Sequence, residues 1–365
     1  MKQRAGQLSF AFSLVGAFFL LQCPASALAG DDAHGPAFKG YICYRASQPI
    51  HVDGRMDDAA WKSAPWTDSF EDIEGNLKPT PRFKTRAKML WDDRYLYVGA
   101  ELEEPHVWGT MLKRDTVICL ENDFEVFFDP DADSHEYYEF EMNALNTVWD
   151  LLMKKPYRDG GPPVDSWDIA GLLTAVHVDG TLNTPGDVDR GWSLEIAFPW
   201  DALKEYAHRP SPPRDGDRWR IGLYRVEWQT NTSGGKYQKV PNVSPDNWAW
   251  SAHGVCDMHR PEQYGYVQFS AAEPGTVSYR PDPTRDVRNV LYQIYYAQKA
   301  YFAEHKQWTG SLGELNLPLQ QAESVGEPSL VLTSEGFEAT ALRTPQTGKQ
   351  ERWHIRQDSR IWKEE

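Results

Sequence analysis

Residues Glu136–Asn143 read EYYEFEMN, and this stretch decides the fold class. Apolar Tyr138, Phe140 and Met142 alternate with polar Glu139, Glu141 and Asn143. Side chains of a β-strand point to opposite faces in turn, so this period of two predicts a strand with one buried and one solvated face.

Similar short segments surround this strand. Turn residues such as Asp92-Asp93-Arg94 and Asp179-Gly180 separate most of them. We predict further strands at residues 85–91, 95–101, 123–129, 147–153, 172–178, 192–198, 219–228 and 264–269. Many short strands with little helix favour an all-β fold, an antiparallel, jelly-roll-like β-sandwich over residues 40–272.

The C-terminal part has a different pattern. Apolar residues between Asp282 and Lys306 follow helical spacing, and strand-like runs follow after Gly310 and Gly313. Pro and Gly cluster near Gly275–Pro283. We therefore expect a small α+β domain over residues 283–365, which could bind a protein partner.

The N-terminus predicts export. Basic Lys2 and Arg4 precede an apolar run from Leu8 to Leu21, and Ala27-Leu28-Ala29 has the small-residue pattern of a cleavage site. These features are typical of a signal peptide over residues 1–29 and of a secreted or periplasmic protein. No other segment is apolar enough to predict a transmembrane helix.

The composition limits the partners and the compartment chemistry. The 53 acidic and 38 basic residues give a net charge of −15, which disfavours nucleic acid. The 15 Trp residues indicate a large aromatic core, a stacking surface, or both. Cys43, Cys119 and Cys256 would remain after cleavage, either as one disulfide and one thiol or as three thiols.

Five motifs occur in a characteristic order between residues 40 and 270. They are Pro49–Gly54 with Asp57–Trp61, Leu90–Val98, Asn122–Pro130, Trp192–Trp200, and His259–Gly265. Together they resemble the family 9 carbohydrate-binding modules, a β-sandwich group. The resemblance implies sugar binding by aromatic stacking and polar contacts, often with bound calcium. Founding members carry a sugar-clamping Trp just before the acidic start of the strand that corresponds to Asn122–Pro130. The matching stretch here, Ile118–Asn122, has no aromatic residue, which indicates a divergent branch.

Candidate ligand residues follow from two strand pairs and several loops. If Ala144-Leu145-Asn146 forms the turn, Glu141 lies opposite Trp149, and the indole shares the polar face; a two-residue turn would instead direct it to the core. The strand at 219–228 offers a similar face. The loops contribute Trp and Tyr residues that either contact ligand or cap the sandwich. The candidates are Trp149, Glu141, Asn143, Arg225, Glu227, Trp228, Trp167, Trp248, Trp250, Tyr157 and Arg158.

One turn carries three carboxylates at alternate positions, those of Asp129, Asp131 and Asp133. They could provide oxygen ligands for a calcium ion, or the segment could be an ordinary acidic turn. Carboxylates such as Glu125, Glu139, Glu141 and Glu227 could also supply the acid pair of a glycoside hydrolase. Relatives in the wider superfamily bind haem through Met and His, which draws attention to Met258-His259, although neighbouring strand residues point to opposite faces.

We expect a secreted carbohydrate-binding protein without catalysis. The alternative is a glycoside hydrolase or a hydrolase-associated subunit, and a haem-binding electron-transfer domain is a lesser alternative.

Overall fold

The computed structural model describes residues 38–317, 323–346 and 348–365, so the predicted signal peptide lies outside the described residues. The described residues all belong to one compact unit. Its first part contains β1 (Gly40–Arg45), α1 (Ala59–Ser63), β2 (Glu71–Asp72), β3 (Thr85–Trp91), β4 (Tyr95–Glu103), β5 (Asp123–Asp129), β6 (Tyr137–Asn143), β7 (Val148–Met153), β8 (Pro163–Val164), β9 (Leu173–Asp179), β10 (Gly191–Pro199), α2 (Trp200–Leu203), β11 (Arg218–Glu227), β12 (Thr230–Ser233), β13 (Lys236–Lys239), β14 (Asp246–Ala249) and β15 (Gly265–Ser270).

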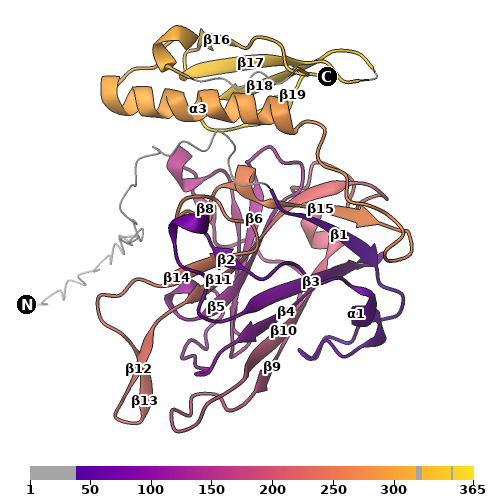
Figure 1. The fold of residues 1–365 in the computed structure, drawn as a ribbon, viewed down its shortest axis with the longest axis vertical. Coiled ribbons are helices and arrows are strands. Elements are labelled where there is room, and N and C mark those ends of the chain that lie inside the picture. Colours follow the sequence, from indigo (N-terminus) through magenta and orange to yellow (C-terminus); the bar gives the residue numbers. More distant parts are fainter. Residues whose placement is uncertain (1–37, 318–322, 347) are drawn as a thin grey trace, which may run out of the picture. The chain divides into compact units, whose positions relative to one another are not determined.

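The predicted β-sandwich is confirmed, and its two layers belong to one continuous sheet. Thirteen strands are hydrogen-bonded, with the order β8-β7-β6-β5-β11-β15-β1-β3-β4-β10-β9 and with β14 and β2 branching from β11. Strand β1 pairs in parallel with both β15 and β3, so the sheet is mixed rather than purely antiparallel. Rings from the two halves meet inside: the Phe198 ring centroid lies 4.8 Å from that of Phe128 and 5.2 Å from that of Phe140. The arrangement is drawn in Figure 1.

Strand β6 shows how far the alternation pattern holds. Tyr138, Phe140 and Met142 are fully buried in the sandwich core, as predicted. The prediction of a solvated opposite face is wrong, because Glu139 and Glu141 are 4% and 2% exposed. Chain segments far away in sequence cover that face, since the Cys119 N–H donates to Glu141 and the Tyr137 hydroxyl hydrogen-bonds to the His259 ring.

The opening sequence motif has a structural explanation in one carboxylate. Glu195 of β10 accepts the backbone N–H groups of Asp53 and Gly54 at 2.9 and 2.7 Å and the Trp61 indole N–H at 2.6 Å. Gly54 has φ +87°, and a Cβ there would lie 2.6 Å from the backbone of Val176. The Asp-Gly pair and the Trp therefore attach the N-terminal segment to β10.

The predicted C-terminal α+β elements are present. They comprise α3 (Arg285–His305), β16 (Ser329–Leu332), β17 (Phe337–Arg343), β18 (Glu351–Arg356) and the unpredicted β19 (Ile361–Lys363). The helix and this four-stranded sheet share a separate core that includes Leu291 and Phe337. Hydrogen bonds such as Ser134–Tyr292, at 2.6 Å, join these elements to the strand region.

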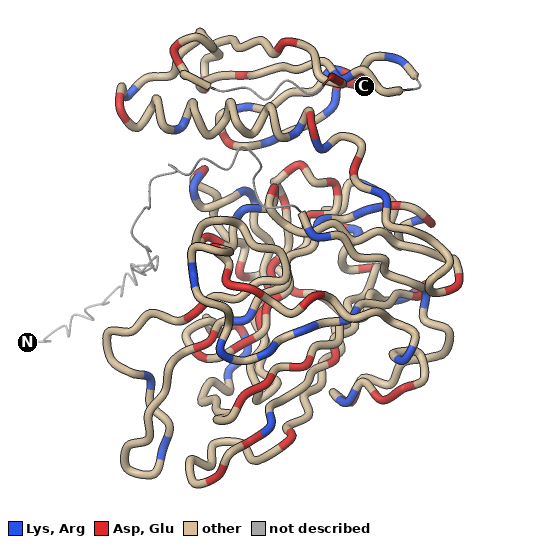
Figure 2. The backbone as a smooth tube through the Cα atoms, in the orientation of Figure 1, with Lys and Arg blue, Asp and Glu red and all other residues tan. Residues whose placement is uncertain are grey.

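Charged residues of both signs are spread over the described chain. Acidic and basic residues are interspersed along the strands and loops in Figure 2, without a basic stripe. Among the described residues, no helix has the length and apolar character needed to cross a membrane.

Candidate functional site

A buried ionic network lies at one end of the sandwich around Arg225 of β11. The guanidinium donates to Glu227 Oε2 at 2.8 Å and to Glu104 Oε2 at 2.9 Å, and also to Thr85 and the Glu103 carbonyl. Arg225 is only 1% exposed. The Asn122 amide bridges the two acids, at 3.1 Å from Glu104 and 2.9 Å from Glu227.

The network carries more acid than base in its interior. Burial, followed by the neighbouring Glu227, raises the pKa of Glu104 to about 8. Arg82 reaches Glu227 at 3.0 Å from the surface and also pairs with Asp246. The site is thus a preformed set of donors and acceptors held in fixed orientation.

Aromatic rings adjoin this network. The Trp228 backbone N–H donates to Asn122 Oδ1 at 2.8 Å, and the Trp228 indole N–H donates to the Cys119 carbonyl at 3.0 Å. Trp228 clusters with Trp108 and Tyr237. The Trp108 indole nitrogen is buried and has no hydrogen-bond partner among the described residues. A buried indole N–H without an acceptor is costly, so this position favours an additional acceptor group.

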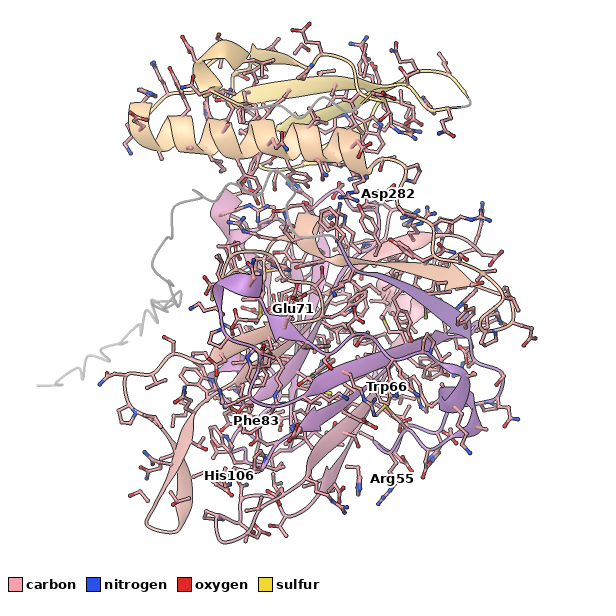
Figure 3. The ribbon with its side chains drawn as sticks, viewed as in Figure 1. Arg55, Trp66, Glu71, Phe83, His106 and Asp282 are labelled. Carbon is pink, nitrogen blue, oxygen red and sulfur yellow. The ribbon has the colours of Figure 1, made fainter. Side chains whose placement is uncertain are left out.

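The β12–β13 hairpin covers these rings. Its two strands pair only with each other within the described sheets. Lys239 places its ammonium 3.7 Å from the Trp228 ring centroid, and Tyr237 contacts His106 at 3.2 Å. Most hairpin residues are exposed, and Tyr237 is its buried contact. Figure 3 labels His106, which marks the partner of this hairpin in the rest of the chain.

The structure therefore brings four of the predicted residues together, Arg225, Glu227, Trp228 and Trp248. Sequence reasoning missed Glu104, Trp108 and Tyr237 as parts of the same site. Trp108 and Glu104 lie outside every strand pattern, and Tyr237 lies in a short Gly-containing hairpin. Among the residues of the network that were not predicted as ligand contacts, Asn122 alone lies in a sequence motif, the Asn122–Pro130 motif.

The predicted register of the β6–β7 hairpin is confirmed. Glu141 lies opposite Trp149, and the turn is the three-residue one. Trp149 is nevertheless only 6% exposed, because it packs with Ile118 and Tyr137 under the segment before β5. Asn143 accepts the backbone N–H groups of Leu145 and Thr147, so its side chain caps the turn.

Of the remaining aromatic candidates, Trp248 adjoins the network, because the Arg225 guanidinium lies 5.0 Å from its ring centroid, whereas Trp250 and Trp167 are not among the network's contacts. The prediction that Trp248 and Trp250 lie in loops is wrong for Trp248, which belongs to β14; both are 2% exposed in the sandwich core, since β14 pairs with β11. Trp167 is half-buried, donates to Glu205 at 2.9 Å and packs on Tyr138.

Tyr157 and Arg158 lie near the C-terminal elements. Arg158 pairs with Glu262 at 2.9 Å and donates to the Tyr295 hydroxyl of α3 at 3.2 Å. The Tyr157 ring packs edge-on against His259, whose pKa burial lowers to about 4. The structure does not bring these residues to the Trp228 site.

The three aspartates of the turn after β5 converge, with one oxygen of each within 4.8 Å of the others. Asp129 is fully buried, and its Oδ1 has no hydrogen-bond partner among the described residues. Burial and the neighbouring Asp131 raise the pKa of Asp133 to about 6. A buried, unpartnered carboxylate oxygen beside two further carboxylates fits the oxygen ligands that calcium requires.

An open surface groove of about 980 Å³ lies away from these groups. Residues 46–52 and 172–174 line it, together with Asp92, Arg94, Tyr95 and Tyr97. Tyr95 is half-buried there, so this groove also presents an aromatic ring.

The chain is similar in sequence to segments of two known proteins. The chain is 26% identical over 208 residues to endo-1,4-beta-xylanase A of Thermotoga maritima and 34% identical over 89 residues to endo-1,4-beta-xylanase C of Paenibacillus barcinonensis. These matches cover 54% and 24% of this chain but span only 16% and 7% of the two relatives.

A solved family 9 carbohydrate-binding module from Caldicellulosiruptor kristjanssonii, in complex with cellotriose, aligns with 67% of this chain and 100% of that chain, at a TM-score of 0.42 and 16% identity. The family model described as carbohydrate family 9 binding domain-like matches residues 52–254. That range contains strands β2 to β14, the Arg225 network and the aromatic rings beside it, and it shows that the chain belongs to the carbohydrate family 9 binding domain-like family.

Proposed function

We propose that this protein binds a glycan outside the cytoplasm, without bond cleavage, through Trp228 and Trp108. The observation that carries this proposal is the pairing of two indoles with a rigid polar network in one place. Sugar rings offer apolar C–H faces to indoles, and their hydroxyls exchange hydrogen bonds with fixed amides and carboxylates. Family membership supports the same conclusion.

The hairpin β12–β13 gives the site a way to open. Displacing it removes Tyr237 and Lys239 from the two indoles without breaking any pairing of the main sheet. The exposed Trp228 face would then stack on a sugar. Asn122, which accepts the Trp228 backbone N–H, and Glu227, which accepts from Asn122, would be the polar partners of its hydroxyls. The Trp108 indole N–H would gain a hydroxyl oxygen as its acceptor.

Binding to a glycan array and affinity electrophoresis in soluble β-glucans and xylans test this proposal. Trp228→Ala and Trp108→Ala should each weaken binding by about 30-fold, which corresponds to about 2 kcal/mol for a central aromatic contact. Trp66→Ala is the matched control, because Trp66 is a half-buried indole under Arg86 and Lys88, remote in sequence and absent from the Trp228 cluster. Figure 3 labels Trp66 and His106 at separate positions.

Three results would count against the proposal. Unchanged binding by both Trp variants, with loss in Tyr95→Ala, would move the site to the open groove. No binding to any glycan would remove the binding function. Accumulation of reducing ends during incubation with oligosaccharides would replace it with hydrolysis, the alternative considered from the sequence.

Calcium and export complete the proposal. Asp129, Asp131 and Asp133 would hold a calcium ion, supported by the buried Asp129 oxygen without a partner. A location outside the cytoplasm is supported by the basic and apolar pattern of residues 1–29.

A further inference from the structure

Four carboxylates project from the face of β5 and β6 that lies opposite the sandwich core. They are Asp123, Glu125, Glu139 and Glu141. Glu125 pairs directly opposite Glu141 across the two strands. One oxygen from each of Asp123, Glu125 and Glu141 lies within 4.8 Å of the others. Like charges opposite each other destabilise a strand pair, so something in the folded protein must offset this arrangement.

These carboxylates are sealed from water. Their exposed fractions are 0% for Asp123, 1% for Glu125, 4% for Glu139 and 2% for Glu141. Asp123 Oδ2, Glu125 Oε2 and Glu139 Oε2 are buried without a hydrogen-bond partner among the described residues. Proteins rarely bury an unpartnered carboxylate oxygen, and three in one cluster indicate a missing partner.

No basic side chain of the described residues supplies that partner. His259 comes nearest, with Nδ1 4.0 Å from Glu139, but this nitrogen is hydrogen-bonded to the Tyr137 hydroxyl at 2.9 Å. The buried arginines have partners elsewhere. Arg225 pairs with Glu104 and Glu227, and Arg158 pairs with Glu262. Arg220 donates to the Pro261 carbonyl, and Arg288 donates to the Ala132 carbonyl. The cluster must therefore take up protons or a cation.

We propose that Asp123, Glu125 and Glu141, with Glu139 as a fourth ligand, bind one divalent cation of the calcium type inside the sheet. Oxygens bound to one Ca²⁺ at about 2.3–2.6 Å lie no more than about 5 Å apart, which the observed separation satisfies. Bidentate carboxylates would supply the six to eight oxygens that this ion prefers. The ligands are all hard oxygens, which disfavours zinc and copper.

The position of this site gives the cation a structural consequence. Glu141 Oε2 accepts the Cys119 backbone N–H at 2.9 Å, and the Cys119 carbonyl accepts the Trp228 indole N–H at 3.0 Å. A cation that orients Glu141 would therefore also hold the segment that positions Trp228. This site is separate in residues from the turn aspartates and from the proposed glycan contacts.

The test begins with full-length protein unfolded in EDTA, refolded, and titrated calorimetrically with Ca²⁺ and with Mn²⁺. Metal content is measured by mass spectrometry after dialysis. Glu125→Gln, which keeps the side-chain volume, should remove one bound ion per chain or weaken its binding by about 100-fold. Asp131→Asn in the turn cluster and Asp168→Asn, an exposed acid beside Arg114, are the matched controls and should leave this ion bound.

Thermal unfolding provides an independent measurement. In EDTA, Glu125→Gln should melt at a higher temperature than wild type, because it removes one of the crowded carboxylates. With saturating Ca²⁺ the order should reverse, since only wild type gains binding energy from the complete site. This reversal in the order of melting temperatures can be measured even if the variant binds no metal, provided that the variant folds.

Other results would overturn the proposal. Equal metal stoichiometry and affinity in wild type and Glu125→Gln would place the ion elsewhere. A refolded wild type that binds no Ca²⁺ or Mn²⁺ and shows the infrared band of protonated carboxylic acids would assign protons to the cluster. Glycan binding is measured separately with Trp228→Ala, so loss of either activity identifies which proposal has failed.

Discussion

Replacing Arg225 with Met offers the most demanding check on the electrostatics of the site. The change removes a buried guanidinium that makes hydrogen bonds to Glu104 and Glu227 at 2.9 and 2.8 Å. It leaves two carboxylates in the interior, for which loss of the partner costs about 3–5 kcal/mol. Arg82, one-third exposed, still contacts Glu227, so we expect the lower end, about 3 kcal/mol at pH 8.

The pH dependence of this loss follows from Glu104. Its pKa is about 8 in the folded protein against an ordinary value of 4.5, so the folded state binds more protons than the unfolded state between these values. The free energy of unfolding therefore falls as the pH rises through that window. The positive charge of Arg225 lowers the pKa of Glu104, so without Arg225 this acid is protonated more readily in the folded protein. At pH 5 the loss should therefore shrink to about 1–2 kcal/mol, the value of the missing hydrogen bonds.

Urea unfolding at pH 5 and pH 8, followed by tryptophan fluorescence and by circular dichroism, measures both values. Lys204→Met is the control, because Lys204 forms an exposed pair with Asp201 and should change the free energy of unfolding by less than about 1 kcal/mol. A loss below 1 kcal/mol at pH 8, or an equal loss at both pH values, would refute the reasoning.

Three further predictions concern other sites. Glu195→Gln should lower the free energy of unfolding by about 1–3 kcal/mol in urea titrations, because an amide cannot accept all three N–H groups that converge on this carboxylate. Gly54→Ala should lower the melting temperature, because its Cβ would lie 2.6 Å from the backbone of β9; an unchanged melting curve would contradict that geometry. Asp131→Asn should reduce calcium binding at the turn while glycan affinity stays at the wild-type value, as measured by calorimetry.

The strand pattern explains why the fold was predictable. Alternation in Glu136–Asn143 requires only that one face be apolar, and Tyr138, Phe140 and Met142 meet that condition locally. The first of the ordered motifs was recognisable for a similar reason, because Asp53, Gly54 and Trp61 lie close together in sequence and all donate to Glu195.

The candidate site was only partly predictable, for a physical reason. Trp228 and Glu227 were recognised because they end a clear strand, whereas Glu104 and Trp108 lie more than 100 residues away and join them only when β11 packs beside the loop after β4. The hairpin sequence also could not predict whether Trp149 is exposed, because the side chain that packs on it, Ile118, lies outside the hairpin.

The sequence by itself determined the alternation, the turns and the family motifs, because these depend on neighbouring residues and on backbone geometry. Only the tertiary structure decided which polar residues are solvated. Covering the second face of β5 and β6 turned an expected sugar-binding surface into an enclosed group of carboxylates. Burial is a property of segments distant in sequence, and no period of two within one strand encodes it.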